Sequence, residues 1–99
     1  MESNLAKVFH VTATRVDDRW CVWESDIRGL FLETDSWLEM KESIESITPM
    51  TLMENHDLKE TDLINVVVRV KIRNGEVKPM RWSGKVTFVF EQDQQLTAT

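Results

Sequence analysis

The stretch that decides the fold spans residues 20–55 and reads WCVWESDIRGLFLETDSWLEMKESIESITPMTLMEN. It predicts a short strand, a turn at Gly29, another strand over residues 30–34 and then a helix. Ser36 and Glu39 form a capping box, because the serine hydroxyl accepts a hydrogen bond from the glutamate amide while the glutamate side chain reaches back. The helix is therefore expected to begin near Trp37.

The apolar residues of this helix recur at helical spacing and form one stripe that is typical of core packing. They are Trp37, Met40, Ile44 and Ile47. Pro49 lacks an amide proton, so we expect a break or kink near Thr48. Thr48 would then cap a second short helix that carries the chain to Asn55.

The same stretch carries a resemblance to a known family. The matching residues are Trp20, the run Ser25-Asp26-Ile27-Arg28-Gly29-Leu30, the run Glu33-Thr34-Asp35-Ser36, and Glu39, Ile44, Pro49, Leu52 and Asn55. In these residues the chain resembles the HicB-like antitoxins, which have a partial ribonuclease H-like fold. The resemblance implies a non-catalytic protein that binds and neutralises a small basic toxin ribonuclease similar to HicA.

Two departures from the family pattern qualify the resemblance. Arg28 stands where the family usually carries proline, although Gly29 beside it is retained. Many family members also append a ribbon-helix-helix or helix-turn-helix domain that binds DNA. The last 38 residues of this chain read as strands instead, so the resemblance is to a short form without that domain.

Upstream, residues 7–16 alternate apolar and polar side chains and predict a first strand. Asp17 and Asp18 then predict a two-residue hairpin turn, which would place Ala13 opposite Val22, Arg15 opposite Trp20 and Thr12 opposite Trp23. Trp20 and Val22 would lie under the helix, with Trp23 on the uncovered face. Trp23 is thus a candidate interface anchor, unless C-terminal strands cover it or the register differs by one residue.

Downstream, residues 54–62 read as a connecting loop and residues 64–73 as the clearest strand. The apolar side chains on one face of this strand are Ile64, Val66, Val68, Val70 and Ile72. Asn74 and Gly75 predict a hairpin turn, and residues 76–81 should return antiparallel. Pro79 suggests an edge position for that return strand. We further expect a bend at Gly84, a last strand over residues 86–91 and a frayed tail over residues 92–99.

Together these elements predict a single α+β domain over residues 1–99. We expect a mostly antiparallel sheet with one main helix on one face, in the order strand, strand, strand, helix, then two or three strands. The opposite face and at least one sheet edge would remain open. We therefore expect self-association, either as a homodimer, which is the commonest closed arrangement, or as a higher homo-oligomer.

Composition limits the possible functions. The chain has 99 residues, of which 41% are hydrophobic, enough for one modest core. It lacks a secretory signal and any run of about 18 to 20 apolar residues, so we expect a cytoplasmic protein with no membrane partner. Its one cysteine, Cys21, cannot form an internal disulfide, which agrees with a reducing compartment, and is expected to be a packed thiol. Residues 1–61 hold 6 basic and 13 acidic side chains, whereas residues 62–99 hold 6 and 4. The acidic side chains of residues 1–61 would attract a basic partner. Alternatively, they form only a solvated acidic surface.

No catalytic, metal or cofactor residues are predicted. Two-metal nucleases of the ribonuclease H type need several carboxylates that converge on the metal ions, beginning with one on the first strand, and residues 7–16 contain none. His10 and His56 lack metal-ligand spacing to each other or to Cys21, so both are expected to be surface or hydrogen-bonded histidines. Three glycines leave no phosphate-binding loop.

Two binding hypotheses remain. The first is a protein-binding surface made of Trp23, Glu24, Asp26, Arg69, Lys71 and Arg73. The alternative is a small RNA-binding module, because a strand face with several cations and one nearby aromatic side chain is able to hold single-stranded RNA. Its residues would be Arg69, Lys71, Arg73 and Trp82, with Lys78, Arg81 and Lys85 nearby in sequence.

Overall fold

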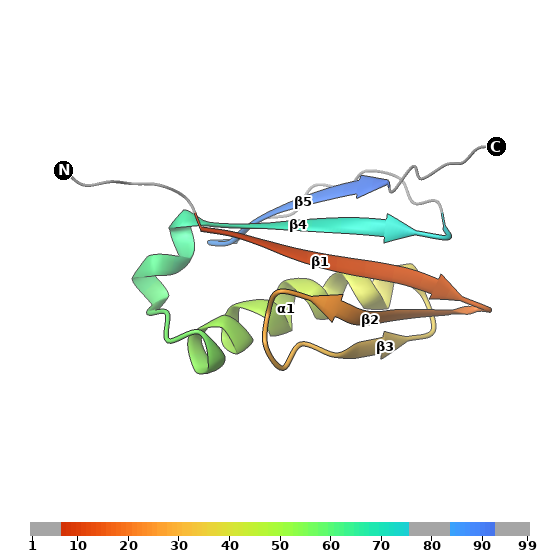
Figure 1. Ribbon diagram of the computed structural model, residues 1–99, viewed down its shortest axis with the longest axis horizontal. Helices are drawn as coiled ribbons and strands as arrows, with labels where there is room; N and C mark the ends of the chain where they lie inside the picture. Colours follow the sequence, from red (N-terminus) through yellow and green to blue (C-terminus); the bar gives the residue numbers. More distant parts are fainter. Residues whose placement is uncertain (1–6, 76–83, 93–99) are drawn as a thin grey trace.

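The computed structural model describes residues 7–75 and 84–92. Its elements, in chain order, are β1 (Lys7–Val16), β2 (Arg19–Ser25), β3 (Leu32–Thr34), α1 (Trp37–Asn55), the 3₁₀ helix η1 (Glu60–Asn65), β4 (Val66–Arg73) and β5 (Thr87–Gln92) (Figure 1). One five-stranded sheet packs against one main helix. The predicted α+β class is confirmed.

The strand order in the sheet is β3-β2-β1-β4-β5. The hairpin partners β1 and β2 are antiparallel, as are β2 and β3, whereas β1 pairs with β4 and β4 with β5 in parallel. A parallel pair requires a long crossover connection. Here α1 and η1 provide it between β3 at one edge and β4, which lies beside β1 on its far side (Figure 1).

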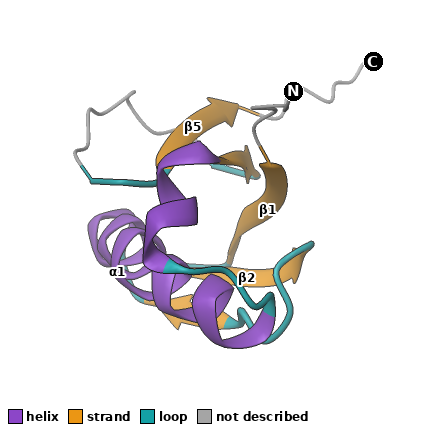
Figure 2. Cartoon of the chain, turned by 90° about the vertical axis from the view of Figure 1, so that its left-hand side faces the viewer, coloured by secondary structure: helices purple, strands orange, loops and turns teal. Residues whose placement is uncertain are grey.

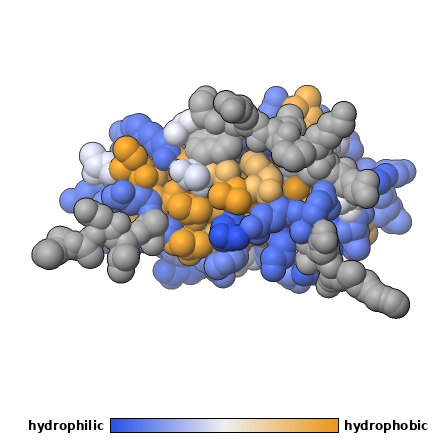
Figure 3. Space-filling view, turned by 90° about the horizontal axis from the view of Figure 1, so that it is seen from above, coloured by the Kyte–Doolittle hydropathy of each residue, from blue (hydrophilic) through white to orange (hydrophobic). Residues whose placement is uncertain are grey.

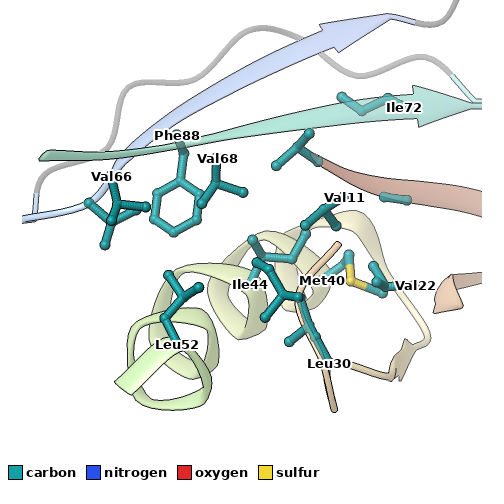
Figure 4. Packing of buried hydrophobic residues seen from close by; sticks show 14 of the residues in the cluster. Val11, Val22, Leu30, Met40, Ile44, Leu52, Val66, Val68, Ile72 and Phe88 are labelled. Carbon is teal, nitrogen blue, oxygen red and sulfur yellow. The ribbon is translucent and has the colours of Figure 1, made fainter. Parts of the chain in front are cut away.

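The hydrophobic core lies between α1 and one face of the sheet. Figure 4 shows Met40, Ile44 and Leu52 pointing from α1 toward the strands, and none of the three is exposed. The sheet contributes buried Val11, Ala13, Val22, Val66, Val68, Val70, Ile72 and Phe88. Burying one large aliphatic side chain contributes about 1.5–3 kcal/mol, so this layer is the main source of stability. The predicted apolar stripe of the helix is confirmed, with Trp37 and Ile47 partly buried against the core.

The β1–β2 hairpin follows the prediction at its turn and departs from it four residues away. Asp17 has a φ of 57°, and the pairs Ala13–Val22 and Arg15–Trp20 are as predicted. The predicted Thr12–Trp23 pair is wrong, because the register shifts between Thr12 and Ala13 and Thr12 pairs with Glu24. A β-bulge of this kind puts two residues of one strand opposite one residue of the other. Trp23 is the extra residue.

The first turn of α1 carries a serine cap at the predicted place. The helix begins at Trp37, and the Ser36 hydroxyl accepts a hydrogen bond from the Glu39 amide at 3.2 Å. The Glu39 carboxylate accepts from the amide of Asp35 at 3.3 Å, one residue before the cap. The strand that precedes the helix is shorter than predicted, because Leu30 is buried within the turn and β3 begins only at Leu32.

The predicted helix break near Thr48 is wrong. Pro49 lies inside α1, which continues to Asn55, and Thr48 is fully buried in the helix instead of capping a new one. Ile44 and Leu52 lie on either side of the proline and are both buried in the core. Their packing stabilises the helix on both sides of the proline despite the missing proline amide.

The connection after α1 contains more structure than the predicted loop. Residues 60–65 form η1, whose start is fixed by the Asp62 carboxylate, which accepts a hydrogen bond from the Lys59 amide at 2.8 Å. Ile64 therefore belongs to η1 and is 69% exposed, so its predicted place on the apolar strand face is wrong. The remaining members of that face, Val66, Val68, Val70 and Ile72, are buried as predicted.

The chain after β4 is described only in part. Asn74 has a φ of 64°, which fits the predicted turn, but the predicted return strand over residues 76–81 and the edge role of Pro79 lie outside the described residues. Gly75 lies against the ring of Trp20, where an added Cβ would be 2.6 Å from a ring carbon. The last strand, β5, begins one residue later than predicted and includes Gln92; the rest of the predicted tail lies outside the described residues.

The turn between β2 and β3 is tied to the C-terminal end of α1. The Asn55 side-chain amide donates to the Arg28 carbonyl at 2.6 Å, and the Arg28 amide donates to His56 Nε2 at 2.9 Å. Gly29 has a φ of 84°, and a Cβ there would lie 2.5 Å from the Asn55 amide nitrogen. This turn therefore requires glycine for both its backbone angle and the space it leaves.

Replacing Gly29 by alanine should lower the free energy of unfolding by about 1–3 kcal/mol, since the added Cβ strains the backbone and displaces Asn55. Urea unfolding would measure the change. Arg28→Ala at the neighbouring exposed position is the matched control and should change it by less than about 0.5 kcal/mol. Equal effects of the two substitutions would contradict this account of the turn.

Acidification should weaken the hydrogen bond that the Arg28 amide donates to His56. Burial, and secondly the charge of Arg28, lower the pKa of His56 below its ordinary value. The unfolded chain then binds a proton at about pH 6.5 while the folded chain does not, so stability falls as the pH drops from about 6.5 toward the folded pKa. The stability difference between wild type and His56→Gln, measured by urea unfolding from pH 8 to pH 5, should shrink on acidification. His10 is present in both proteins and cancels, and a constant difference would refute the assignment.

Candidate functional site

The face of the sheet opposite α1 gathers the charged and aromatic side chains singled out by sequence. We call it the open face, because α1 lies on the other side of the sheet (Figure 2). Since Val11 and Ala13 in β1 and Val68, Val70 and Ile72 in β4 are buried on the helix side, the residues that alternate with them point to the open face. These residues are His10, Thr12, Arg69, Lys71 and Arg73.

An exposed tryptophan with two neighbouring carboxylates lies at the β2–β3 end of the open face. Trp23 is 55% exposed, and its indole N–H donates to the Glu33 carboxylate at 3.2 Å. Glu33 lies on β3 and is also 3.9 Å from the guanidinium of Arg19. Glu24 follows Trp23 directly and lies 3.7 Å from the guanidinium of Arg73 on β4. Glu24 pairs with Thr12 in β1, so the β-bulge brings Trp23 and Glu24 together on this surface.

Asp26 lies at the end of the open face and is fixed by His10. Its Oδ2 contacts His10 Nδ1 at 2.9 Å and accepts from the His10 amide at 3.0 Å, and its own amide donates to the His10 carbonyl at 2.9 Å. Chiefly because of the side-chain hydrogen bond to His10, the pKa of Asp26 is lower than usual. Asp26 therefore carries a negative charge at neutral pH. His10 is a hydrogen-bonded surface histidine, one of the two outcomes expected for it.

Two basic residues of β4 lie beside carboxylates, one from the neighbouring strand β5 and one from β2, which lies beyond β1. Arg69 forms an ion pair with Glu91 on β5, and Arg73 lies near Glu24 on β2. A hollow of about 280 Å³ is lined by His10, Val11, Thr12, Arg69, Lys71 and Glu91. Trp82, the aromatic residue of the RNA hypothesis, lies outside the described residues, as do Lys78 and Arg81.

Several residues of this surface were not predicted from the sequence. Glu91 lies on β5, and only the parallel pairing of β5 with β4 brings it next to Arg69. Glu33 lies on β3, the strand that follows β2, and the β2–β3 pairing brings it next to Trp23. His10 had one usable signal, its place on the polar side of the first strand, but its partner Asp26 is sixteen residues away. Cys21 is buried, and burial raises the pKa of its thiol, which fits the predicted packed cysteine.

A second, more open hollow of about 400 Å³ lies between β3 and the start of α1. Its lining includes Arg19, Glu33, Asp35, Glu39 and Glu42. Within residues 7–75 and 84–92, no group of three or more histidine, cysteine, aspartate or glutamate side chains is placed to hold a metal ion.

Apolar surface is also present near the β5 edge of the sheet. Figure 3 looks down on the molecule from the β5 side and shows apolar residues gathered in the middle of that view, bordered by polar ones. Phe90 and Val89 of β5 are only partly buried. An edge strand with apolar side chains is a surface on which another chain is able to pair.

No family model, curated protein or solved structure matches this chain. In the part of the chain that the structure describes, no helix combines the length and the apolar character needed to cross a membrane. The case for a function therefore depends on the chain's own side chains.

The two tryptophans of β2 should respond very differently to substitution. Trp20 is 6% exposed and packs against Trp37 with ring centroids 5.0 Å apart, so Trp20→Ala should lower the free energy of unfolding by about 3–5 kcal/mol. Trp23→Ala should change it by less than about 1 kcal/mol, because most of this ring is already in solvent. Thermal and urea unfolding measure both, and a loss at Trp23 as large as that at Trp20 would mean that Trp23 is a core residue.

Proposed function

We propose that this domain is a non-catalytic, antitoxin-like protein of the cytoplasm that binds and neutralises a small basic toxin ribonuclease similar to HicA. The observation that carries the proposal is Trp23, an exposed aromatic side chain with Glu24 and Glu33 beside it on the open face. Large exposed aromatic side chains are typical anchors of protein interfaces. The carboxylates around this one favour a basic partner.

Neutralisation on this proposal is steric. The six contact residues predicted from the sequence are Trp23, Glu24, Asp26, Arg69, Lys71 and Arg73. Five of them lie across the open face, and Asp26 lies at its end. Trp23 would form the centre of the interface, and the charged groups would form its rim and set orientation and association rate. Covering the partner's substrate-binding surface is then sufficient to silence it.

We further propose that the free domain is a homodimer. Apolar surface at the β5 edge favours self-association through that edge, which leaves Trp23 accessible to the partner. Sedimentation velocity over a range of protein concentrations tests this. A wild-type protein that stays monomeric at every concentration would exclude the homodimer.

RNA binding is the second candidate, and the hollow beside His10, Thr12, Arg69 and Lys71 is the observation that favours it. Cations that line a groove attract a phosphate backbone. However, Glu91 pairs with Arg69 and Glu24 lies near Arg73, so much of the positive charge is already balanced. Protein binding therefore has the better support.

Affinity capture of the tagged protein at moderate salt, with mass spectrometry and nucleic-acid detection on the eluate, separates the two candidates. We expect a stoichiometric small basic protein. Trp23→Ala should weaken its binding at least about tenfold, since an anchor tryptophan contributes about 2 kcal/mol or more. The purified partner should cleave RNA, and adding the wild-type domain should stop the cleavage.

The charge reversal Arg69→Glu with Lys71→Glu is the matched test for RNA. It should leave capture of the basic protein within about fivefold, because rim charges contribute little. It should abolish RNA retention if RNA is the ligand. RNA recovered without a protein partner, and lost in this variant, would replace the antitoxin proposal by the RNA-binding one.

A further inference from the structure

We propose that Trp23, Glu24 and Glu33 form a binding site for an arginine side chain of the partner protein. This inference rests on the proposed function, because the partner is the basic protein described above. It adds the chemical group that the open face recognises: a planar guanidinium that lies on the indole ring and pairs with the two carboxylates.

The β-bulge makes this site. In a regular hairpin Thr12 would pair with Trp23, and Glu24 would point to the helix side of the sheet with Val22. The extra residue instead pairs Thr12 with Glu24, so a carboxylate and an aromatic ring that are adjacent in sequence share the open face. Trp23 is 55% exposed, and the side chain of Glu24 is 70% exposed.

A hydrogen bond fixes the ring of Trp23 in this site. Its indole N–H donates to Glu33 on the neighbouring strand β3 at 3.2 Å. The indole N–H is thus already hydrogen-bonded, and the exposed part of the side chain is the aromatic ring. The electron-rich face of a tryptophan is the aromatic surface that cations bind best.

The chain's own arginines show which chemical group suits the two carboxylates. The guanidinium of Arg19 lies 3.9 Å from Glu33, and that of Arg73 lies 3.7 Å from Glu24. Both distances exceed a good hydrogen bond, and the carboxylates keep half or more of their side-chain area exposed. A guanidinium placed over Trp23 would make the close contacts that these loose pairs lack.

Arginine fits this site better than lysine. A guanidinium is planar, so it stacks on an aromatic ring while its N–H groups point outward to carboxylates. The lysine ammonium is a compact and strongly hydrated charge that gains less from stacking. Two carboxylates beside the ring also exclude an anionic ligand, because like charges would be brought together.

Nuclear magnetic resonance of the indole N–H groups tests the site in the intact domain. The probes are two short peptides of equal length and charge, one with four arginines and one with four lysines separated by glycines. The signal of Trp23, identified by its loss in Trp23→Phe, should shift saturably with the arginine peptide. We expect the arginine peptide to bind about three- to tenfold more tightly than the lysine peptide.

Two double variants of equal charge change provide the matched comparison. Glu24→Gln with Glu33→Gln should weaken binding of the arginine peptide about three- to tenfold. Glu42→Gln with Glu54→Gln, at exposed positions on α1, should leave it within about twofold. Trp37, whose indole nitrogen is buried, is the internal reference signal.

The arginine site is refuted if the Trp23 signal does not move, if both peptides bind equally, or if the two double variants weaken binding equally. None of these results bears on whether a basic protein is captured. If the proposed function fails, no such protein is captured, whatever the peptides do. The two failures are therefore distinguishable.

Discussion

The packing of α1 against one face of the sheet is the constraint on which the rest of the structure depends. Met40, Ile44 and Leu52 fill the space beneath the strands, and their burial decides which side chains of every strand point inward. Because side chains alternate along a strand, the same packing decides what remains outside. The open face, with Trp23 and the basic residues of β4, is thus a direct consequence of where the helix lies.

Local signals in the sequence predicted the elements well, whereas tertiary packing decided where those predictions failed. The Ser36 cap, the Asp17 turn and the alternation along β4 depend on neighbouring residues, and each lies where the sequence places it. Pro49 is tolerated inside α1 because buried residues on both sides of it pack against the core. The parallel pairing of β4 with β1 depends on a connection of some fifty residues, and no local pattern encodes it.

The candidate site was predictable in its residue types and only partly in its geometry. Trp23 is exposed, as its alternation with Val22 suggests, but the bulge that places Glu24 beside it leaves no mark in the sequence. Glu91 could not be assigned before the strand order was known, because it reaches Arg69 from β5. Glu91 and Glu24 change the electrostatics, since they lie beside Arg69 and Arg73 of β4.

The place of β1 inside the sheet has a consequence for synthesis on the ribosome. Its partner β2 follows at once and α1 soon after, so the β1–β2–β3 unit and its helix are complete once residue 55 has emerged. The other side of β1 pairs with β4, the fourth of the five described strands in chain order. Until then the nascent chain carries an unpaired strand edge, and such edges invite pairing with other chains. We therefore expect aggregation of the newly made protein to increase when synthesis of β4 is delayed.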